Sequence, residues 1–558
     1  MKLKTLISLL FLVTVQLSFS QSSEAYKQLD RSGKKFVNLA EKLVSMGDYK
    51  NAMERYKDAL HTNQDNAEVI YRIGELHYLK KEYPLASQWI ERALVKDSLI
   101  DPKANYILGM SYLNMENLDI AEKKIKKHLD KTDKKTLEYD EVLETYNSIL
   151  VARELMQTPL KVKIENVGEN INSKFPEYSP SLTLDGKFMI FTSRRAAGKS
   201  GKLTDEDRQF YEDVFQSEWD EKTKKWSEAK LIPGKVNTEG HDASLSISPD
   251  GSKIFLYKNI PKETKSGDIY YSTLNMQGTW TAPKPVEDDI NTSYFESSAS
   301  LSADGEYLYF VSESRDGFGE GDIYRAKKTG KNTFGEIKNL GGIVNSPKDE
   351  ISCFIHPDGK TLFFSSKGHQ NMGGYDIFKT VWDEGSEQWS TPQNIGYPIN
   401  TTGDDVHFVL SLNGKIAHYS AIRKEGFGDR DIYSIEFLDD VITQASEVVI
   451  NDNPKKSNLG IFKGRVQIFG TEGPHEATLA IVDASNQKVV ALINTDESGN
   501  FMTSLSSTKE FVITIKSDGF DPITDRIKFD INDDEKLIFK TYTFKKSSSN
   551  DVEMPKTK

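Results

Sequence analysis

The sequence predicts a multidomain α + β protein built from an α-helical repeat array, a ring of five β-sheets and a small β-sandwich. Three observations predict it: a period of 34 to 35 residues near the N-terminus, a period of about 54 residues in the middle, and alternating apolar and polar residues after residue 460. A chain of 558 residues is too long for a single hydrophobic core, so several domains are expected.

The first 20 residues are typical of an export signal. Two lysines precede an apolar run over residues 6–15, and Ser18 and Ser20 occupy the small-residue positions of a cleavage site before Gln21. No cysteine follows the run, so we expect no lipid anchor, and no later apolar run is long enough to predict a membrane span. We therefore expect a soluble mature protein that starts at Gln21 and lies in the periplasm, associated with the outer membrane, or outside the cell.

Residues 34–129 repeat with steps of 34 and then 35 residues, and small residues share two positions of the repeat. Ala40, Gly74 and Gly109 occupy one position, and Ala52, Ala86 and Ala121 occupy the other. Because small residues let two helices cross closely, the pattern resembles tetratricopeptide repeats. Residues 136–156 should form a capping helix, which gives a helical domain over residues 21–158.

The tetratricopeptide resemblance implies a surface that binds other proteins. Such stacks bind extended segments or helices on their concave side, and we expect Tyr71 and His77 to lie among its exposed lining residues. The alternative is that three repeats only space or stabilise the neighbouring domain.

Four markers repeat in phase through the middle of the chain. They are a turn aspartate or asparagine followed by glycine, a strand aspartate followed by a β-branched and an aromatic residue, a large aromatic residue, and an asparagine. The turn residues are Asp185, Asp250, Asp304, Asp358 and Asn413; the strand aspartates are Asp213, Asp268, Asp322, Asp376 and Asp431; the aromatic residues are Trp226, Trp280, Phe334 and Trp389; the asparagines are Asn172, Asn237, Asn291, Asn345 and Asn400.

The common spacing of the four markers predicts a repeated unit of about four short strands. Five copies of this unit predict a five-bladed β-propeller over residues 159–440. Residues 160–168 are expected to supply the closing strand, and the polar insertion 194–213 explains a longer first repeat. The turn and the D-I-Y strand resemble the WD-type repeats of the TolB propeller.

A polar linker over residues 441–459 is expected to lead into a β-sandwich over residues 460–546, followed by a disordered tail over residues 547–558. The stretch "NTDESGNFMTSL" and the following "FVITIKSDGF" resemble the transthyretin-like regulatory domain found beside carboxypeptidases. That resemblance implies a non-catalytic domain without zinc ligands.

The residues favour a protein without catalytic, cofactor-binding or metal-binding sites. A net charge of −12 argues against nucleic-acid binding, and Cys353, the lone cysteine, reads as a small buried residue. A strand aspartate present in every repeat is expected to be structural, and "DGFGEGDIY" lacks the ligand pattern of a calcium loop. Five histidines show no metal-ligand spacing: His241, His356, His369, His407 and His418.

The order of the domains resembles the PorE-like periplasmic proteins of Bacteroidetes, which belong to the type IX secretion and gliding machinery. The resemblance implies a non-enzymatic scaffold associated with the outer membrane through envelope proteins. Those proteins end in an OmpA-like module that grips peptidoglycan, and because no such module follows the sandwich, no peptidoglycan-binding residues are carried over. Two alternatives stay open: a TolB-like envelope module or glycan-binding propeller, and an enzyme with its site in the propeller channel.

Overall fold

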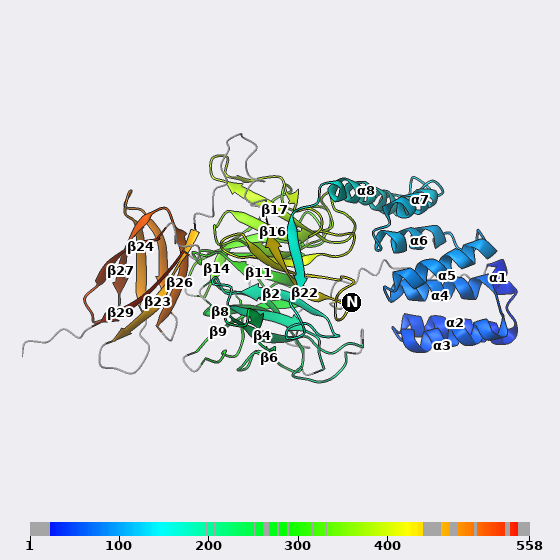
Figure 1. Ribbon diagram of the computed structural model, residues 1–558, viewed down its shortest axis with the longest axis horizontal. Helices are drawn as coiled ribbons and strands as arrows, with labels where there is room; N and C mark the ends of the chain where they lie inside the picture. The colour runs from blue at the N-terminus through cyan, green and yellow to red at the C-terminus, as the bar shows by residue number, and fades with distance from the viewer. Residues whose placement is uncertain are drawn as a thin grey trace, which may run out of the picture.

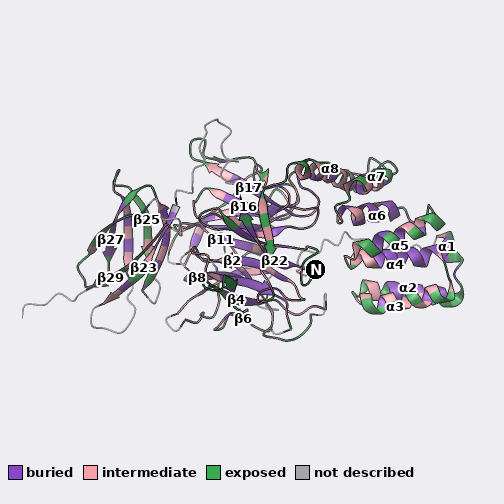
Figure 2. Ribbon diagram, viewed as in Figure 1, coloured by how far each residue is buried: buried purple, intermediate pink, exposed green. Residues whose placement is uncertain are grey.

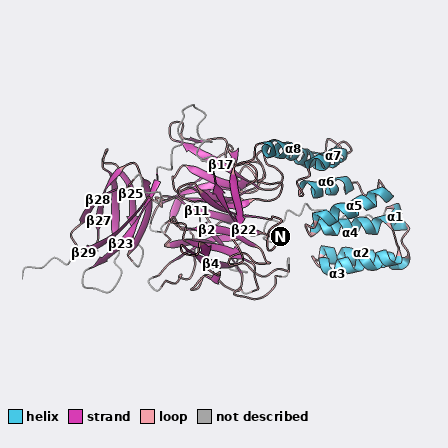
Figure 3. Cartoon of the chain, viewed as in Figure 1, coloured by secondary structure: helices cyan, strands magenta, loops and turns pink. Residues whose placement is uncertain are grey.

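The computed structural model describes residues 23–438 and 459–544, apart from residues 197, 205–207, 250, 260–266, 276–277, 287–288, 315, 331, 469–476, 496–498 and 531–535. The expected export signal, most of the expected linker, the expected tail and Asp250 lie outside the described residues. A helical stack, a group of β-sheets and a two-sheet sandwich follow one another, with the sheets of the middle part between the other two (Figure 1). All described helices precede residue 158, so helix and strand occupy separate parts of the chain (Figure 3).

The helical stack consists of consecutive helix pairs. Its described helices are α1 (Glu24–Lys27), α2 (Arg31–Ser45), α3 (Tyr49–Thr62), α4 (Ala67–Leu79), α5 (Tyr83–Lys96), α6 (Ala104–Leu113), α7 (Leu118–Leu129) and α8 (Leu137–Gln157). Helices α2 and α3, α4 and α5, and α6 and α7 pack against each other in pairs. A Cβ placed on Gly74 would come within 2.6 Å of Ile90, and one on Gly109 within 2.7 Å of Ile125. The small residues are therefore needed where the paired helices cross.

The middle part contains five sheets, numbered here in chain order. Sheet 1 has β2 (Glu177–Leu182), β3 (Phe188–Ser193), β4 (Asp213–Asp220), β5 (Lys225–Trp226) and β6 (Lys230–Leu231); sheet 2 has β7 (His241–Ile247), β8 (Lys253–Asn259), β9 (Asp268–Thr273) and β10 (Lys284–Pro285). Sheet 3 has β11 (Glu296–Leu301), β12 (Tyr307–Ser312), β13 (Asp322–Lys328) and β14 (Phe334–Asn339). Sheet 4 has β15 (Glu350–Ile355), β16 (Thr361–Ser366), β17 (Asp376–Asp383), β18 (Gln388–Trp389) and β19 (Gln393–Asn394). Sheet 5 has β20 (Val406–Leu410), β21 (Ile416–Ala421), β22 (Asp431–Phe437) and β1 (Val162–Asn166).

The first strands of the five sheets contact one another in a cycle. Strand β2 contacts β7, β7 contacts β11, β11 contacts β15, β15 contacts β20, and β20 contacts β2. Strand β1 pairs antiparallel with β22, with Val162 opposite Phe437 and Asn166 opposite Tyr433. The segment expected to supply a closing strand thus joins the start of this region to its end, and we call the five sheets the ring.

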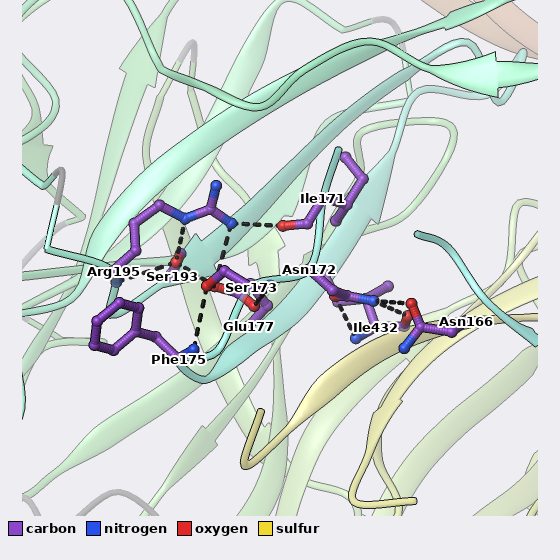
Figure 4. Close-up of polar contacts among 9 residues, drawn as sticks. All are labelled: Asn166, Ile171, Asn172, Ser173, Phe175, Glu177, Ser193, Arg195 and Ile432. Atoms are coloured by element: carbon purple, nitrogen blue, oxygen red, sulfur yellow. Dashed lines mark hydrogen bonds and ion pairs between the residues drawn. The ribbon is translucent and has the colours of Figure 1, made fainter. Parts of the chain in front are cut away.

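The repeated asparagines tie each sheet to the one before it. In every repeat the asparagine side chain accepts from the backbone N–H of the residue after the strand aspartate and donates to the C=O of that residue. Asn172 makes these bonds to Ile432 and also donates to Asn166, so it joins sheet 1 to sheet 5 (Figure 4). Nearby, the buried Glu177 accepts from Ser193 and Arg195.

The other markers have equally local roles. The turn glycines all have positive φ: Gly186 (67°), Gly251 (73°), Gly305 (71°), Gly359 (72°) and Gly414 (69°). The aromatic markers are buried between the sheets. Of the strand aspartates, Asp322, Asp376 and Asp431 each accept a backbone N–H from the preceding loop and an asparagine side-chain N–H. These hydrogen bonds hold the preceding loop and the asparagine side chain against the strand, which is a structural role.

The C-terminal part is a sandwich of two sheets over one apolar core. One sheet has the order β26-β23-β29 and the other has the order β25-β24-β27-β28. The strands are β23 (Leu459–Ile468), β24 (Thr478–Asp483), β25 (Val489–Asn494), β26 (Asn500–Ser506), β27 (Glu510–Lys516), β28 (Ile523–Lys528) and β29 (Leu537–Phe544). Phe462, Phe501, Phe511 and Phe544 are among the buried residues of that core. Strand β29 runs parallel to β23, so the end of the described chain is tied to the first strand of the sandwich.

Candidate functional site

The structure places the two sequence-predicted binding residues differently from the expectation. Tyr71 lies in the middle of α4, has no exposed surface and packs in a core with Ile70, Ala104 and Ala25. The prediction that Tyr71 is an exposed groove residue is therefore wrong. The reason is that α4 contacts α3, α5, α6 and the short α1, so residues 67–76 are all buried (Figure 2).

His77 lies at the end of α4, where the chain turns into α5. Its side chain is 12 % exposed, and its Nδ1 lies 2.5 Å from Oε2 of Glu82. Burial alone would raise the pKa of Glu82, but hydrogen bonds from Lys80 and His77 hold that pKa below its ordinary value. His77 therefore organises the turn between α4 and α5.

Around Tyr71 the stack encloses a charged cluster that the sequence analysis missed. Arg72 is 3 % exposed; its Nε lies 2.9 Å from Glu68 and its Nη1 lies 2.6 Å from Glu75, while Glu41 stands 3.9 Å away. Burial raises the pKa of Glu41 and Glu75 above the ordinary value, although the charge of Arg72 opposes that rise. The four residues belong to α2 and α4, so this cluster joins two repeats, and the spacing of Glu68, Arg72 and Glu75 along one helix was its only sequence signal.

The turn between α4 and α5 and the end of α6 contact one end of the ring. Lys81, between α4 and α5, pairs with Asp429 at 3.2 Å, and the carbonyl of Leu113, at the end of α6, accepts from the Thr402 hydroxyl at 2.7 Å. The last helix adds a bond from Ser148 to Asn371 at 2.7 Å. These contacts fix one edge of the stack against the ring and leave the connections between successive pairs on the opposite edge.

The ring end that faces the stack carries ionisable side chains bonded to one another. Glu212 accepts from the Tyr178 hydroxyl at 2.7 Å and pairs with His241. Burial alone would raise the pKa of Glu212, but the bond to His241 and the charges nearby hold it below its ordinary value. Elsewhere at this end the Tyr375 hydroxyl donates to Asp349. Burial raises the pKa of Asp349 above its ordinary value. Each of these carboxylates already has a partner from the chain itself.

The sandwich lies against the other end of the ring. Leu184 and Leu412, in turns of the ring, form an apolar cluster with Ile461 of β23, and Lys463 pairs with Asp185 at 2.9 Å. Between the two parts lies a cavity of about 1150 Å³, which continues along the seam between sheets 5 and 1.

A second cavity, of about 30 Å³, lies along the first strands and is lined by Ser179, Ser246, Ser298, Cys353 and other residues. Cys353 is buried, as the sequence predicts, and burial raises the pKa of its thiol to about 12. A thiol with that pKa stays protonated at neutral pH and is a weak nucleophile. This cavity is therefore lined by serine hydroxyl groups and a protonated thiol.

Across the described residues, no group of three or more histidine, cysteine, aspartate or glutamate side chains is arranged to hold a metal ion. The five histidines stay apart: His369 contacts the carbonyl of Val344 at 2.9 Å, His356 pairs with Asp358 at 3.2 Å, and His407 stacks on Tyr178. Burial lowers the pKa of His407 to about 3. None of the helices in the described part is long and apolar enough to cross a membrane.

Comparison with known proteins identifies the stack. The family model described as tetratricopeptide repeat matches residues 43–105, so this segment is a tetratricopeptide repeat region. Among solved structures, the stack is similar to the first tetratricopeptide domain of Spaghetti bound to an HSP90 peptide, with 15 % identity and a TM-score of 0.20, covering 22 % of this chain and 96 % of that chain. It is also similar to the Yersinia enterocolitica type III secretion chaperone SycD in complex with a peptide of the translocator YopD, with 18 % identity, a TM-score of 0.20, and 22 % and 93 % coverage.

A larger part of the chain is similar to a luciferin-regenerating enzyme, with 12 % identity and a TM-score of 0.29, covering 50 % of this chain and 96 % of that chain. No curated protein matches the chain.

Proposed function

We propose that the protein is a non-enzymatic scaffold whose tetratricopeptide stack binds another protein through the edge that points away from the ring. One observation carries the proposal. Three large apolar side chains on or beside the connections along this edge are almost fully exposed: Val95 (87 %), Leu99 (78 %) and Leu137 (81 %). The opposite edge contacts the ring at Lys81 and Leu113. Exposed apolar side chains that gather on one edge are typical of surfaces that bind proteins.

The rest of the molecule supports a presenting role. The cycle of five sheets and the pairing of β1 with β22 support the interpretation of residues 159–440 as a five-bladed β-propeller. The two-sheet core supports a carboxypeptidase-regulatory-like sandwich. A non-enzymatic role is supported by the partnered carboxylates at one end of the ring and the sandwich against the other.

The proposal includes a cellular setting. The N-terminal "MKLKTLISLLFLVTVQLSFSQ" supports export to the periplasm, and the partner would then be an envelope protein associated with the outer membrane. The order of the three domains supports a link to type IX secretion or gliding. In this setting the stack supplies affinity for a partner, and the ring and sandwich hold it at a fixed distance from further components.

The test is co-purification from envelope fractions with charged variants of the exposed edge. Leu99→Glu and Leu137→Glu should each lower the yield of the partner at least fivefold, because a carboxylate at an apolar contact must lose its water on binding. Leu492→Glu in the sandwich, at a leucine that is 60 % exposed, is the matched control and should leave the yield unchanged. Wild-type yield from both stack variants would contradict the proposal.

A further inference from the structure

Two seams of the ring carry the same pair of tryptophans. Trp219 and Trp226 belong to sheet 1, and Trp382 and Trp389 occupy the same positions of sheet 4, since the first of each pair follows the strand aspartate by six residues. The ring centroids are 5.4 Å apart in the first pair and 5.5 Å apart in the second, with interplanar angles of 68° and 65°. The seam between sheets 5 and 1 can therefore be compared, position by position, with the seam between sheets 3 and 4.

In the seam between sheets 3 and 4 the chain covers the tryptophans with its own side chains. The guanidinium carbon of Arg325 lies 5.3 Å from the ring centroid of Trp382 and 5.2 Å from that of Tyr307, so the cation contacts both rings. Tyr309 meets Trp389 edge to face at 6.2 Å and 84°. We call this the filled seam.

In the seam between sheets 5 and 1 the same positions hold smaller side chains. Repeat spacing places Ile416 where the filled seam has Tyr307, His418 where it has Tyr309, and Ser434 where it has Arg325. His418 keeps the edge-to-face contact, at 6.0 Å and 77° from Trp226. Ile416, however, is 46 % exposed, and Ser434 brings no cation to Trp219. The cavity of about 1150 Å³ is lined by Trp219, Trp226, Ile416, His418 and Ser434. We call this seam the open seam.

The two seams also differ in the charged residues on the strand that pairs with the Arg325 or Ser434 position. Arg325 lies opposite Lys338 on β14, whereas Ser434 lies opposite Glu165 on β1. On and beside β12, β13 and β14, the filled seam carries the cations Arg325, Lys327 and Lys338 and the carboxylates Glu306 and Glu336. On and beside the equivalent strands β21, β22 and β1, the open seam carries the cations Lys163 and Lys415 and the carboxylates Glu165 and Glu436. Lys163 pairs with Glu165 at 3.0 Å, but both side chains are more than half exposed and such pairs are weak. At the position of Arg325 the open seam therefore has no cation, although Lys187, Lys224 and Lys225 of sheet 1 also line the cavity.

We propose that the open seam binds an arginine side chain of a partner protein, with the guanidinium over Trp219 in the place that Arg325 takes over Trp382. A planar guanidinium stacks on an indole face and keeps its N–H groups free for a carboxylate, which Glu165 supplies at the rim. Lysine, a compact and strongly hydrated cation, fits this arrangement less well. The site is separate from the apolar edge of the tetratricopeptide stack, so either proposal can fail while the other holds.

The test uses the full mature chain labelled with 5-fluorotryptophan and observed by fluorine NMR. The chain has six tryptophans, so single Trp→Phe variants assign the resonances. The probe is Nα-acetyl-arginine methylamide, and its neutral isostere, Nα-acetyl-citrulline methylamide, is the control. We expect a saturable shift of the Trp219 resonance with the arginine probe, at least three times that with the citrulline probe, and no shift of Trp382, which Arg325 covers.

Two variants check that the seam is responsible. Ile416→Tyr with Ser434→Arg copies the filled seam and should abolish the response of Trp219, whereas Tyr307→Ile with Arg325→Ser opens the filled seam and should make Trp382 respond. Unchanged resonances of the other tryptophans show that each variant is folded. Equal shifts with both probes, no shift at Trp219, or an equal response of Trp219 to maltotriose, which would indicate a sugar site, would each overturn the proposal.

Discussion

The side-chain amide of Asn172 bonds to both backbone groups of Ile432, 260 residues further along the chain. Its Nδ2 donates to the Ile432 carbonyl at 2.8 Å, and its Oδ1 accepts from the Ile432 N–H at 2.9 Å. Together with the pairing of β1 and β22, this clamp joins the first sheet of the ring to the last. Closure of the ring therefore depends on contacts between segments that are distant in sequence.

Asn172→Ala should lower the free energy of unfolding by about 2–4 kcal/mol, because it leaves a buried N–H and C=O without partners. Urea denaturation measures the loss. Asn291→Ala is the matched comparison, since Asn291 makes the same two bonds to Ile269 between consecutive sheets. A loss below about 0.5 kcal/mol in both variants would show that the asparagines are not the clamps.

Gly305→Val should destabilise the protein by about 1–3 kcal/mol, because Gly305 has a φ of 71° and a β-branched residue resists that conformation. A Cβ at this position meets nothing within 4 Å, so the loss reports backbone strain alone. Gly305→Asn should cost much less, since asparagine tolerates positive φ. Thermal melts of the two variants that coincide would contradict this reading of the turn.

Glu350→Gln should change how stability depends on pH. Burial raises the pKa of Glu350 to about 7, against 4.5 as its ordinary value, even though the carboxylate accepts from Ser346 and Ser366. Between these pH values the folded state binds more protons than the unfolded state, so this contribution is complete below pH 4.5 and is lost as the pH rises through 7.

The unfolding free energy of the wild type relative to Glu350→Gln should therefore fall by up to about 3 kcal/mol between pH 4.5 and pH 8. Urea denaturation of both proteins at several pH values measures the difference and cancels the effect of other groups. A difference that stays constant or grows with pH would contradict the raised pKa.

The sequence predicted what each repeat carries in common. Glycine at the turns, the structural aspartates and the closing strand follow from periodicity, because every copy must make the same hydrogen bonds. The first repeat is longer than the others, and the insertion that explains its length lies between β3 and β4.

What differs between copies could not be predicted. Tyr71 has the sequence context of a groove residue, but its burial depends on how α1, α3 and α6 surround α4. The bonds of Asp429 to Lys81 and of Thr402 to Leu113 join domains far apart in sequence, and no periodicity encodes them. The open seam becomes visible only when Ser434 and Arg325 are compared in space.

The measurement that tests the central claim most directly is site-specific photo-crosslinking in intact envelopes. Leu99 and Leu137 of the stack, and Leu492 of the sandwich as control, are replaced one at a time by p-benzoylphenylalanine in the full chain. The account predicts discrete ultraviolet-dependent adducts with one partner protein from both stack positions and none from position 492. Adducts of equal yield from all three positions, or adducts from position 492 alone, would contradict the claim that the exposed edge of the stack is the docking surface.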